Sequence, residues 1–187
     1  MELTLAQWLV IGICTVLILG YILGYYYNRQ QAGRILAWLR SGLEKWGSVS
    51  VGEKLPGMIT GGQLIVKKAS EPFQRIEAVY LLAPRENLFF WLFHRLQGRG
   101  DELVLKIILP KAPKARMEAK RSWRSDFLYH GQGAEEKLAA FLARHGRAVF
   151  HLALRREAPH LFVRVYLPAL MADSTGAFIA SLSELIA

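Results

Sequence analysis

The chain lacks the residues on which disulfide and cysteine-metal chemistry depend. Its 187 residues include one cysteine, Cys14, which excludes an intrachain disulfide framework and any site with several cysteine ligands. It also lacks Lys and Arg before position 29, although 24 such residues follow, against 15 Asp and Glu in the whole chain. The composition, 52% hydrophobic and 21% charged, excludes disordered, collagen-like and polar linker proteins. The length favours one globular domain with room for a short extra segment.

Catalytic motifs are also missing from the sequence. No histidine belongs to an H-x-x-x-H or H-E-x-x-H pattern, so a zinc site has no support. There is no G-x-S-x-G nucleophile elbow, and residues 57–62 lack the Lys-Ser/Thr pair of a phosphate-binding loop. We therefore predict no catalytic residue, no metal, no cofactor and no small-molecule substrate. A membrane-bound enzyme with a dispersed active site stays open as one hypothesis, with His94, His151 or Asp126 lining its pocket.

An uncharged apolar run occupies residues 8–27. As a helix, 20 residues span about 30 Å, which matches the hydrocarbon core of a bilayer. Trp8 lies at one end and Tyr25, Tyr26 and Tyr27 at the other, as in an aromatic belt. No basic region precedes the run and no small-x-small cleavage site follows it, which argues against a cleaved signal peptide. The sequence therefore predicts a transmembrane anchor over residues 1–28.

The charge distribution predicts the orientation of this anchor. Basic residues start at Arg29 and continue to the end of the chain, whereas Glu2 is the one charge before the span. The positive-inside rule then places the N-terminus outside and residues 28–187 in the cytoplasm. We expect a single-pass membrane protein in contact with membrane lipid, with Cys14 inside the bilayer.

Three glycines of the span, Gly12, Gly20 and Gly24, are spaced by multiples of four and share one helix face. Residues 20–24 form a G-x-x-x-G pattern, which lets another helix approach closely. The face is a candidate packing surface for a lateral partner helix. Glycine is also common in membrane helices without such a partner.

Residues 29–46 show helical spacing of apolar residues and predict a juxtamembrane amphipathic helix. Basic side chains along it can reach anionic headgroups. The expected membrane-surface residues are Arg29, Arg34, Trp38, Arg40, Lys45 and Trp46. In the alternative interpretation, the apolar stripe packs on the domain that follows.

Residues 47–62 are rich in Gly, Ser and Pro and indicate a linker, and residues 63–187 indicate a cytoplasmic domain. Within it, strand patterns cover 63–66, 75–82, 101–109, 148–155 and 160–167, and helical patterns cover 85–97, 134–145 and 175–186. Residues 111–129 show no regular pattern. The order predicts an α+β fold, with a mixed or largely antiparallel sheet and helices packed on one face.

A basic cluster stands out within the irregular stretch. It contains six cations against the single acid Glu118, with one interleaved tryptophan. The candidate contact residues are Lys111, Lys114, Arg116, Lys120, Arg121, Trp123 and Arg124. Such a cluster has the charge to contact phosphates in RNA or in lipid headgroups, or it is a solvated surface. No RRM or KH signature is present, which argues against reading of bases.

Six consecutive large apolar residues, 88–93, predict a helix that is apolar all round. We expect most of this helix in the core of the domain. The alternative is that one face meets the membrane or a partner protein.

A series of short patterns follows the membrane segment. An arginine-bearing stretch at 27–30 precedes an Ala-Trp pair at 37–38, and a strand pattern at 80–82 leads into Arg-Glu-Asn-Leu at 85–88. Further patterns are an acidic-led strand at 101–107, a basic stretch at 120–127 and an aromatic-aliphatic strand ending in Leu-Pro at 161–168. In order and residue type, residues 20–168 resemble the conserved part of the coiled-coil domain-containing protein forty-seven (calumin) family, a subunit of the eukaryotic PAT complex.

The chain departs from that family in two ways. It lacks the acidic domain before the membrane helix, to which calcium binding is attributed, and the long lysine-rich helical tail after the last strand. We therefore expect a compact prokaryotic relative. The resemblance implies a non-enzymatic adaptor or chaperone of multipass membrane-protein insertion, with the Sec translocon, an insertase partner subunit and ribosomal RNA as partners. The runner-up is a structural accessory subunit of another membrane complex.

Overall fold

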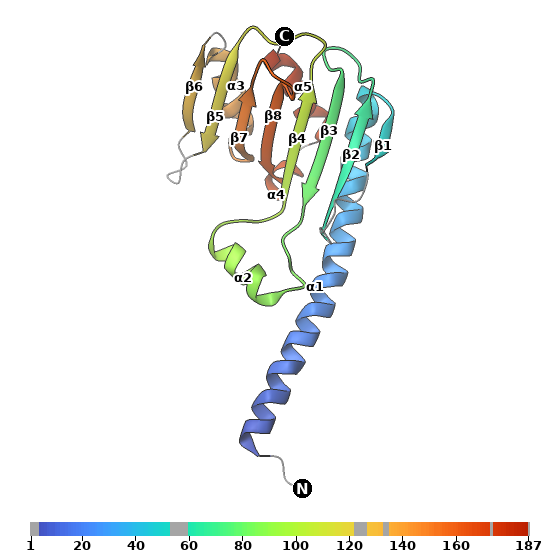
Figure 1. Ribbon diagram of the computed structural model, residues 1–187, viewed down its shortest axis with the longest axis vertical. Helices are drawn as coiled ribbons and strands as arrows, with labels where there is room; N and C mark the ends of the chain where they lie inside the picture. Colours follow the sequence, from blue (N-terminus) through green and yellow to red (C-terminus); the bar gives the residue numbers. More distant parts are fainter. Residues whose placement is uncertain (1–3, 53–59, 122–126, 133–134, 173, 187) are drawn as a thin grey trace.

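The computed structural model describes residues 4–52, 60–121, 127–132, 135–172 and 174–186. Figure 1 shows a long N-terminal helix with an α+β domain on its C-terminal half, so that the N-terminal half projects away from the sheet. The predicted α+β class, with one long apolar helix followed by a sheet and helices, is confirmed.

The N-terminal helix, α1, runs without a break through Leu5–Leu43 and continues into a 3₁₀ turn, η1, at Glu44–Trp46. The expected division into a membrane helix and a separate helix over 29–46 is therefore wrong. Neither proline nor a capping motif interrupts the helix near Asn28, so nothing in the local sequence ends it. With 39 residues, α1 is close to 60 Å long at about 1.5 Å per residue, roughly twice the thickness of a hydrocarbon core.

The domain is built on one eight-stranded sheet with the order β1-β2-β3-β4-β8-β7-β5-β6. All strand pairs are antiparallel, which decides between the mixed and the antiparallel alternatives. The strands are β1 (Val49–Val51), β2 (Gly61–Lys67), β3 (Arg75–Leu81), β4 (Glu102–Ile108), β5 (Arg116–Arg121), β6 (Phe127–Gln132), β7 (Val149–Leu154) and β8 (Leu161–Tyr166).

Three of these strands were not predicted. β5 lies in the stretch 111–129, which shows no regular pattern, β6 begins in it and runs on to Gln132, and β1 lies in the expected linker 47–62. β5 alternates charged residues with Met117 and Ala119, so only two short apolar side chains mark its buried face. Pairing with β7 on one side and β6 on the other makes this weak pattern a strand.

Helices cover one face of the sheet. They are the C-terminal half of α1, α3 (Glu135–His145) and α5 (Thr175–Ile186), while the short α4 (Leu167–Leu170) follows β8. Ile35, Leu39 and Leu43 of α1 join the same hydrophobic core as the helix-facing side chains of the strands. At Gly42 a Cβ atom would overlap Thr175, so the glycine permits close packing of α1 on α5. The apolar stripe of residues 29–46 therefore packs on the domain, as the alternative interpretation expected.

The opposite face of the sheet carries charged and half-buried side chains. Arg164 donates two hydrogen bonds to Glu102, at 2.7 and 2.8 Å, from the neighbouring strand. The hydrogen bond to Glu102 raises the pKa of the Arg164 guanidinium. Among the described residues no helix covers this face, which agrees with the predicted one-sided arrangement.

The two halves of α1 have different surroundings, and paired substitutions test this difference. Leu39 is fully buried, whereas Leu23 is 68% exposed. We expect Leu39→Ala to destabilise the domain by about 3 kcal/mol and to lower its Tm by roughly 6–12 °C, because the truncation leaves a cavity under the sheet. Leu23→Ala is the matched control and should leave the Tm in detergent micelles unchanged. Equal shifts would contradict the packing of α1.

Candidate functional site at the membrane

The N-terminal half of α1 is an apolar surface that the fold does not bury. An 18-residue window of this helix has a mean hydropathy of 2.2, and none of it is buried. Large side chains such as Leu9 and Ile18 are both 60% exposed. The helix is long and apolar enough to cross a bilayer, and burial in the core of the protein does not account for its composition.

A second apolar surface is formed by α2 (Leu88–Leu96), which connects β3 to β4. Asn87 caps its N-terminus by accepting a hydrogen bond from the backbone N–H of Phe90 at 3.2 Å. No residue of α2 is buried. The exposed large side chains are Phe89, Phe90, Leu92, Phe93 and Leu96, with exposures from 50 to 80%. The expectation that most of this helix lies in the core is therefore wrong. The helix lies beyond the lower end of the sheet, outside the core (Figure 1).

The glycine face of α1 receives the start of α2. A Cβ atom at Gly24 would overlap the backbone of Arg85 and Glu86, and one at Gly20 would touch Leu88 at 3.9 Å. The chain's own β3–α2 connection thus occupies the part of the face that was predicted for a lateral partner helix. Gly12 has nothing within 4 Å and remains open.

These contacts fix the depth of α2 relative to the apolar part of α1. Gly20 and Gly24 lie three to seven residues before Tyr27, the last residue of the predicted span. That separation corresponds to about 5–10 Å along the helix axis. Amphipathic helices in a membrane interface bury their apolar face to about the same depth, 5–10 Å. The fold therefore holds the start of α2 beside the C-terminal end of the predicted span.

Polar contacts tie the connections on both sides of α2 to α1. We call Asn28, Arg85, Glu86 and Asp101 the polar node. The Asn28 amide donates to the Ala83 carbonyl at 3.0 Å and to Glu86 Oε2 at 2.7 Å, and its Oδ1 accepts from Arg85 at 3.0 Å. Arg85 also makes a bidentate pair with Asp101, both bonds at 2.9 Å. Asn28 and Asp101 are buried, at 4% and 6% exposure.

The polar node makes the position of α2 definite. Arg85 and Glu86 precede α2, Asp101 follows it, and Asn28 belongs to α1. The Arg85 guanidinium also stacks over the Tyr27 ring at 4.8 Å. A buried carboxylate without its partner costs about 3–5 kcal/mol, so the arrangement resists opening. In the sequence, Asn28 marks the polar node as the first strongly polar group after the uncharged run. Its partners lie more than fifty residues away, so the sequence pattern alone does not identify them.

An apolar groove of about 590 Å³ lies between the two helices. Its lining consists of Leu5, Trp8, Leu9, Gly12, Ile13, Val16, Leu17, Leu88 and Phe89. Among the residues that the structure describes, no charged side chain lines it. The groove joins the exposed surfaces of α1 and α2 into one apolar region.

The expected membrane-surface residues are separated by the straight course of α1. Beyond Tyr27 the axis rises by about 10 Å to Arg34, about 20 Å to Arg40 and about 28 Å to Trp46. Trp46 packs edge-on against the buried Phe73, with ring centroids 5.0 Å apart. Trp38 is likewise half-buried against the core. The structure therefore packs the rings of Trp38 and Trp46 on the domain. The contact of the six residues with a membrane surface stays a prediction.

The predicted basic contact segment does not form one patch. Lys111, Lys114 and Arg116 lie at the start of β5, at the end of the sheet away from α2. Lys120 and Arg121 lie at its other end, where Arg121 donates to the Arg147 carbonyl at 3.2 Å. Trp123 and Arg124 lie outside the described residues. Because a strand rises about 3.3 Å per residue, β5 separates the cations into two groups.

The residues named for a dispersed active site are not brought together. His94 lies on α2, and His151 lies on β7, where it pairs with Glu118 at 2.8 Å. This hydrogen bond lowers the pKa of the Glu118 carboxyl. Asp126 lies outside the described residues. Within the described ranges, no group of three or more His, Cys, Asp or Glu side chains is arranged to hold a metal ion.

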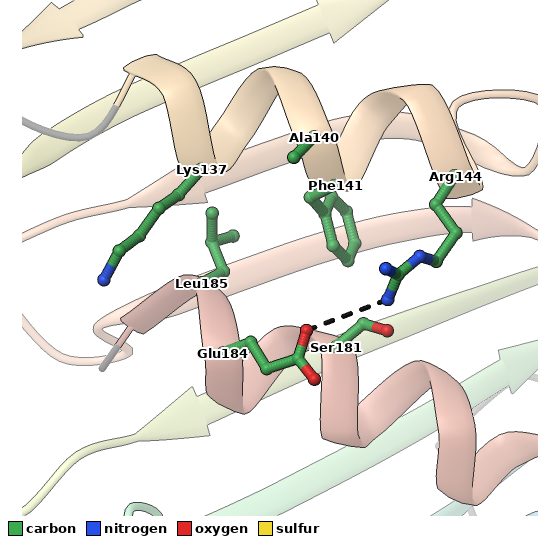
Figure 2. A pocket seen from close by; sticks show the side chains of 7 residues that line it. All are labelled: Lys137, Ala140, Phe141, Arg144, Ser181, Glu184 and Leu185. Atoms are coloured by element: carbon green, nitrogen blue, oxygen red, sulfur yellow. Dashed lines mark ion pairs between the residues drawn. The ribbon is translucent and has the colours of Figure 1, made fainter.

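Figure 2 shows a small hollow between α3 and α5. It has a volume of about 130 Å³, with Phe141 and Leu185 among its lining residues. Arg144 and Glu184 face each other across it at 3.7 Å. The Arg144–Glu184 pair leaves Lys137 as the remaining cation of the lining, which gives no convergent set of groups for a substrate.

The close contact at Gly24 is tested by one substitution made at two positions. Gly24→Ala should displace the β3–α2 connection from α1 and lower the Tm, because the added methyl group overlaps the Arg85 backbone. Gly12→Ala adds the same methyl group in open space and should leave the Tm unchanged or raise it slightly, since alanine favours a helix over glycine by about 1 kcal/mol. Thermal unfolding in nanodiscs measures both. A Gly24→Ala protein as stable as Gly12→Ala would contradict the contact.

Comparison with known proteins assigns no family to the chain. No protein-family model matches it, and no curated protein sequence matches it at significant similarity. The likeness to the coiled-coil domain-containing protein forty-seven family stays an expectation from sequence patterns.

Proposed function

We propose that this protein is a membrane-anchored, non-enzymatic adaptor that assists the insertion of multipass membrane proteins, close to the Sec translocon and the ribosome. One observation carries the proposal: α2 exposes its large apolar side chains beside the C-terminal end of the apolar run of α1. A soluble domain would bury such a helix. The sequence resemblance to a translocon-associated family supports the same function independently of this geometry.

The chemistry of α2 suits the interface of a bilayer. Its exposed apolar residues are followed by a polar end at His94 and Arg95, and Arg99 comes after the helix. Arg95 also lies over the Trp91 ring at 6.0 Å from its centroid. Aromatic side chains beside cations are typical of helices that lie in the headgroup region. We infer that α2 enters the same leaflet through which α1 leaves the membrane.

Two apolar helices joined at one end can shelter an apolar segment. In the proposed orientation the groove between α1 and α2 would open into the hydrocarbon region. The polar node ties the start of α2 to α1. A client helix that has not yet found its own partners would meet a prearranged surface there. This role needs no catalytic group, in keeping with an adaptor or chaperone.

The positive charge of the domain supports a cytoplasmic location. The N-terminus would then lie outside, in agreement with the positive-inside rule. The membrane-facing end of the sheet would meet the inner leaflet, and the opposite end would point into the cytoplasm.

The depth of α2 is measured with fluorescent probes on introduced cysteines. In a Cys14→Ser background, a probe at Phe90→Cys should be quenched by brominated lipid acyl chains, because Phe90 projects from the exposed α2. A probe at Lys111→Cys, at the far end of the sheet, is the control and should not be quenched. It should react with a membrane-impermeant reagent from the cytoplasmic side alone. A Phe90 probe quenched by aqueous iodide and not by lipid would overturn the insertion of α2.

The function is tested by crosslinking during translation. A photoreactive residue at Phe93, in α2, should crosslink to nascent multipass chains, and this product should disappear after puromycin release, because the contact is transient. The same residue at Leu128, also exposed but on β6, is the control. Crosslinks that persist after release, to a stable subunit outside the Sec machinery, would instead support the runner-up, a structural accessory subunit. Purification in mild detergent identifies that subunit.

A further inference from the structure

Most of the excess positive charge lies in three connections between strands. Counted with the strand-end residues Lys67, Arg75 and Arg116, these are residues 67–75 from β2 to β3, 109–116 from β4 to β5, and 155–160 from β7 to β8. They hold eight basic and two acidic residues, a net charge of +6 out of +9 for the chain. The basic residues are Lys67, Lys68, Arg75, Lys111, Lys114, Arg116, Arg155 and Arg156. We call these residues the distal basic rim.

The sheet register brings the three connections to one end of the molecule. Lys67 pairs with Arg75, which pairs with Ile108 at the end of β4. From there the backbone N–H of Leu109 donates to His160 at 3.0 Å, and the Arg155 N–H donates to the His160 carbonyl at 2.7 Å. Figure 1 shows these connections at the end of the sheet opposite α2. The rim is therefore one continuous edge.

The height of the rim excludes lipid headgroups as its ligand. The backbone N–H of Ser70, in the first connection, donates to the Trp46 carbonyl at 2.7 Å. Trp46 lies about 28 Å along the helix axis from Tyr27, where the predicted span ends. Even with α1 tilted by about 40°, the rim stays more than about 20 Å from the bilayer. That distance exceeds two Debye lengths of about 8 Å at physiological salt.

The dimensions and chemistry of the rim suit a polyphosphate backbone. From β2 to β5 the sheet crosses five strand spacings, about 24 Å at 4.8 Å each. Seven of the eight basic side chains are exposed. Phe73, the one aromatic residue of the three connections besides His160, is buried, so no aromatic ring is offered to stack on a base. Protein interfaces are depleted in lysine and rely on aromatic anchors, which this rim lacks.

We propose that the distal basic rim binds the sugar-phosphate backbone of a structured RNA, without reading its sequence. The proposal rests on the proposed function for the cytoplasmic location of the rim, and it deepens that function by naming the surface that meets RNA. It separates this surface from Lys120 and Arg121, which lie at the membrane end of β5. Binding of this kind releases counterions and is therefore steeply salt-dependent.

The test measures binding of full-length protein, in nanodiscs of neutral phosphatidylcholine, to an RNA duplex of about 20 base pairs. The rim variant carries Lys111→Glu, Lys114→Glu and Arg156→Glu. A control variant carries Arg34→Glu, Lys120→Glu and Arg147→Glu, which change the net charge equally but lie outside the rim. We expect the rim variant to bind at least tenfold more weakly, with a log–log salt slope less negative by about 1 for each phosphate that it no longer neutralises. The control variant should bind nearly as well as the unaltered protein.

Several results would overturn the proposal. If both variants bound RNA equally weakly, net charge alone would explain the binding. If the rim variant bound RNA as well as the unaltered protein, the RNA would bind elsewhere. Poly-glutamate that binds the unaltered protein more weakly than RNA supports a phosphate ligand. Poly-glutamate that competes equally would make the rim a surface for acidic protein. The lipid quenching of the α2 probe is independent of each outcome, so an absence of RNA binding leaves the membrane insertion of α2 standing.

Discussion

Asn28 is the residue at which the membrane helix and the domain become one structure. Its side chain shares hydrogen bonds with Arg85 and Glu86 before α2, and Arg85 in turn binds Asp101 after α2. Buried polar groups are stable only when their partners are in place, so this set of contacts has one arrangement. The depth of α2, the opening of the groove and the stacking of Arg85 on Tyr27 all follow from it. Without this node, α2 would be an apolar loop with no defined place at the bilayer.

The continuity of α1 is the second constraint. Because the helix is unbroken, the position of a residue in the sequence sets how far along the axis it lies from the apolar run. Asn28 follows directly on the apolar run, while Trp46 lies about 27 Å further along the helix axis and is packed on Phe73. The sheet runs alongside this helix, so its two ends have different neighbours. One end lies beside α2 with its exposed apolar side chains, and the other carries most of the excess positive charge. The single helix α1 thus sets the separation between the apolar surface of α2 and the cationic end of the sheet.

The sequence was sufficient for features that depend on composition and periodicity. The uncharged run, the α+β order and the helices over 134–145 and 175–186 needed no tertiary knowledge. The sequence predicted the structure wrongly where contacts between residues far apart in the chain determine it. Residues 88–93 have the composition of a core helix, and their exposure follows from Gly20, Gly24 and Asn28 holding the connection before them. β5 shows only Met117 and Ala119 on its buried face and becomes a strand through its neighbours. The cations of residues 111–124 look like one cluster until the strand separates them.

The unbroken α1 also acts as a lever arm. In the proposed orientation its apolar end would respond to the thickness of the bilayer by tilting, since a span longer than the hydrocarbon core inclines to bury its length. The domain is packed on the other end and must follow. With the far edge of the sheet about 28 Å beyond the span, each 10° of inclination moves that edge sideways by about 5 Å. A thinner bilayer would therefore swing the domain across the membrane plane without any change inside the fold.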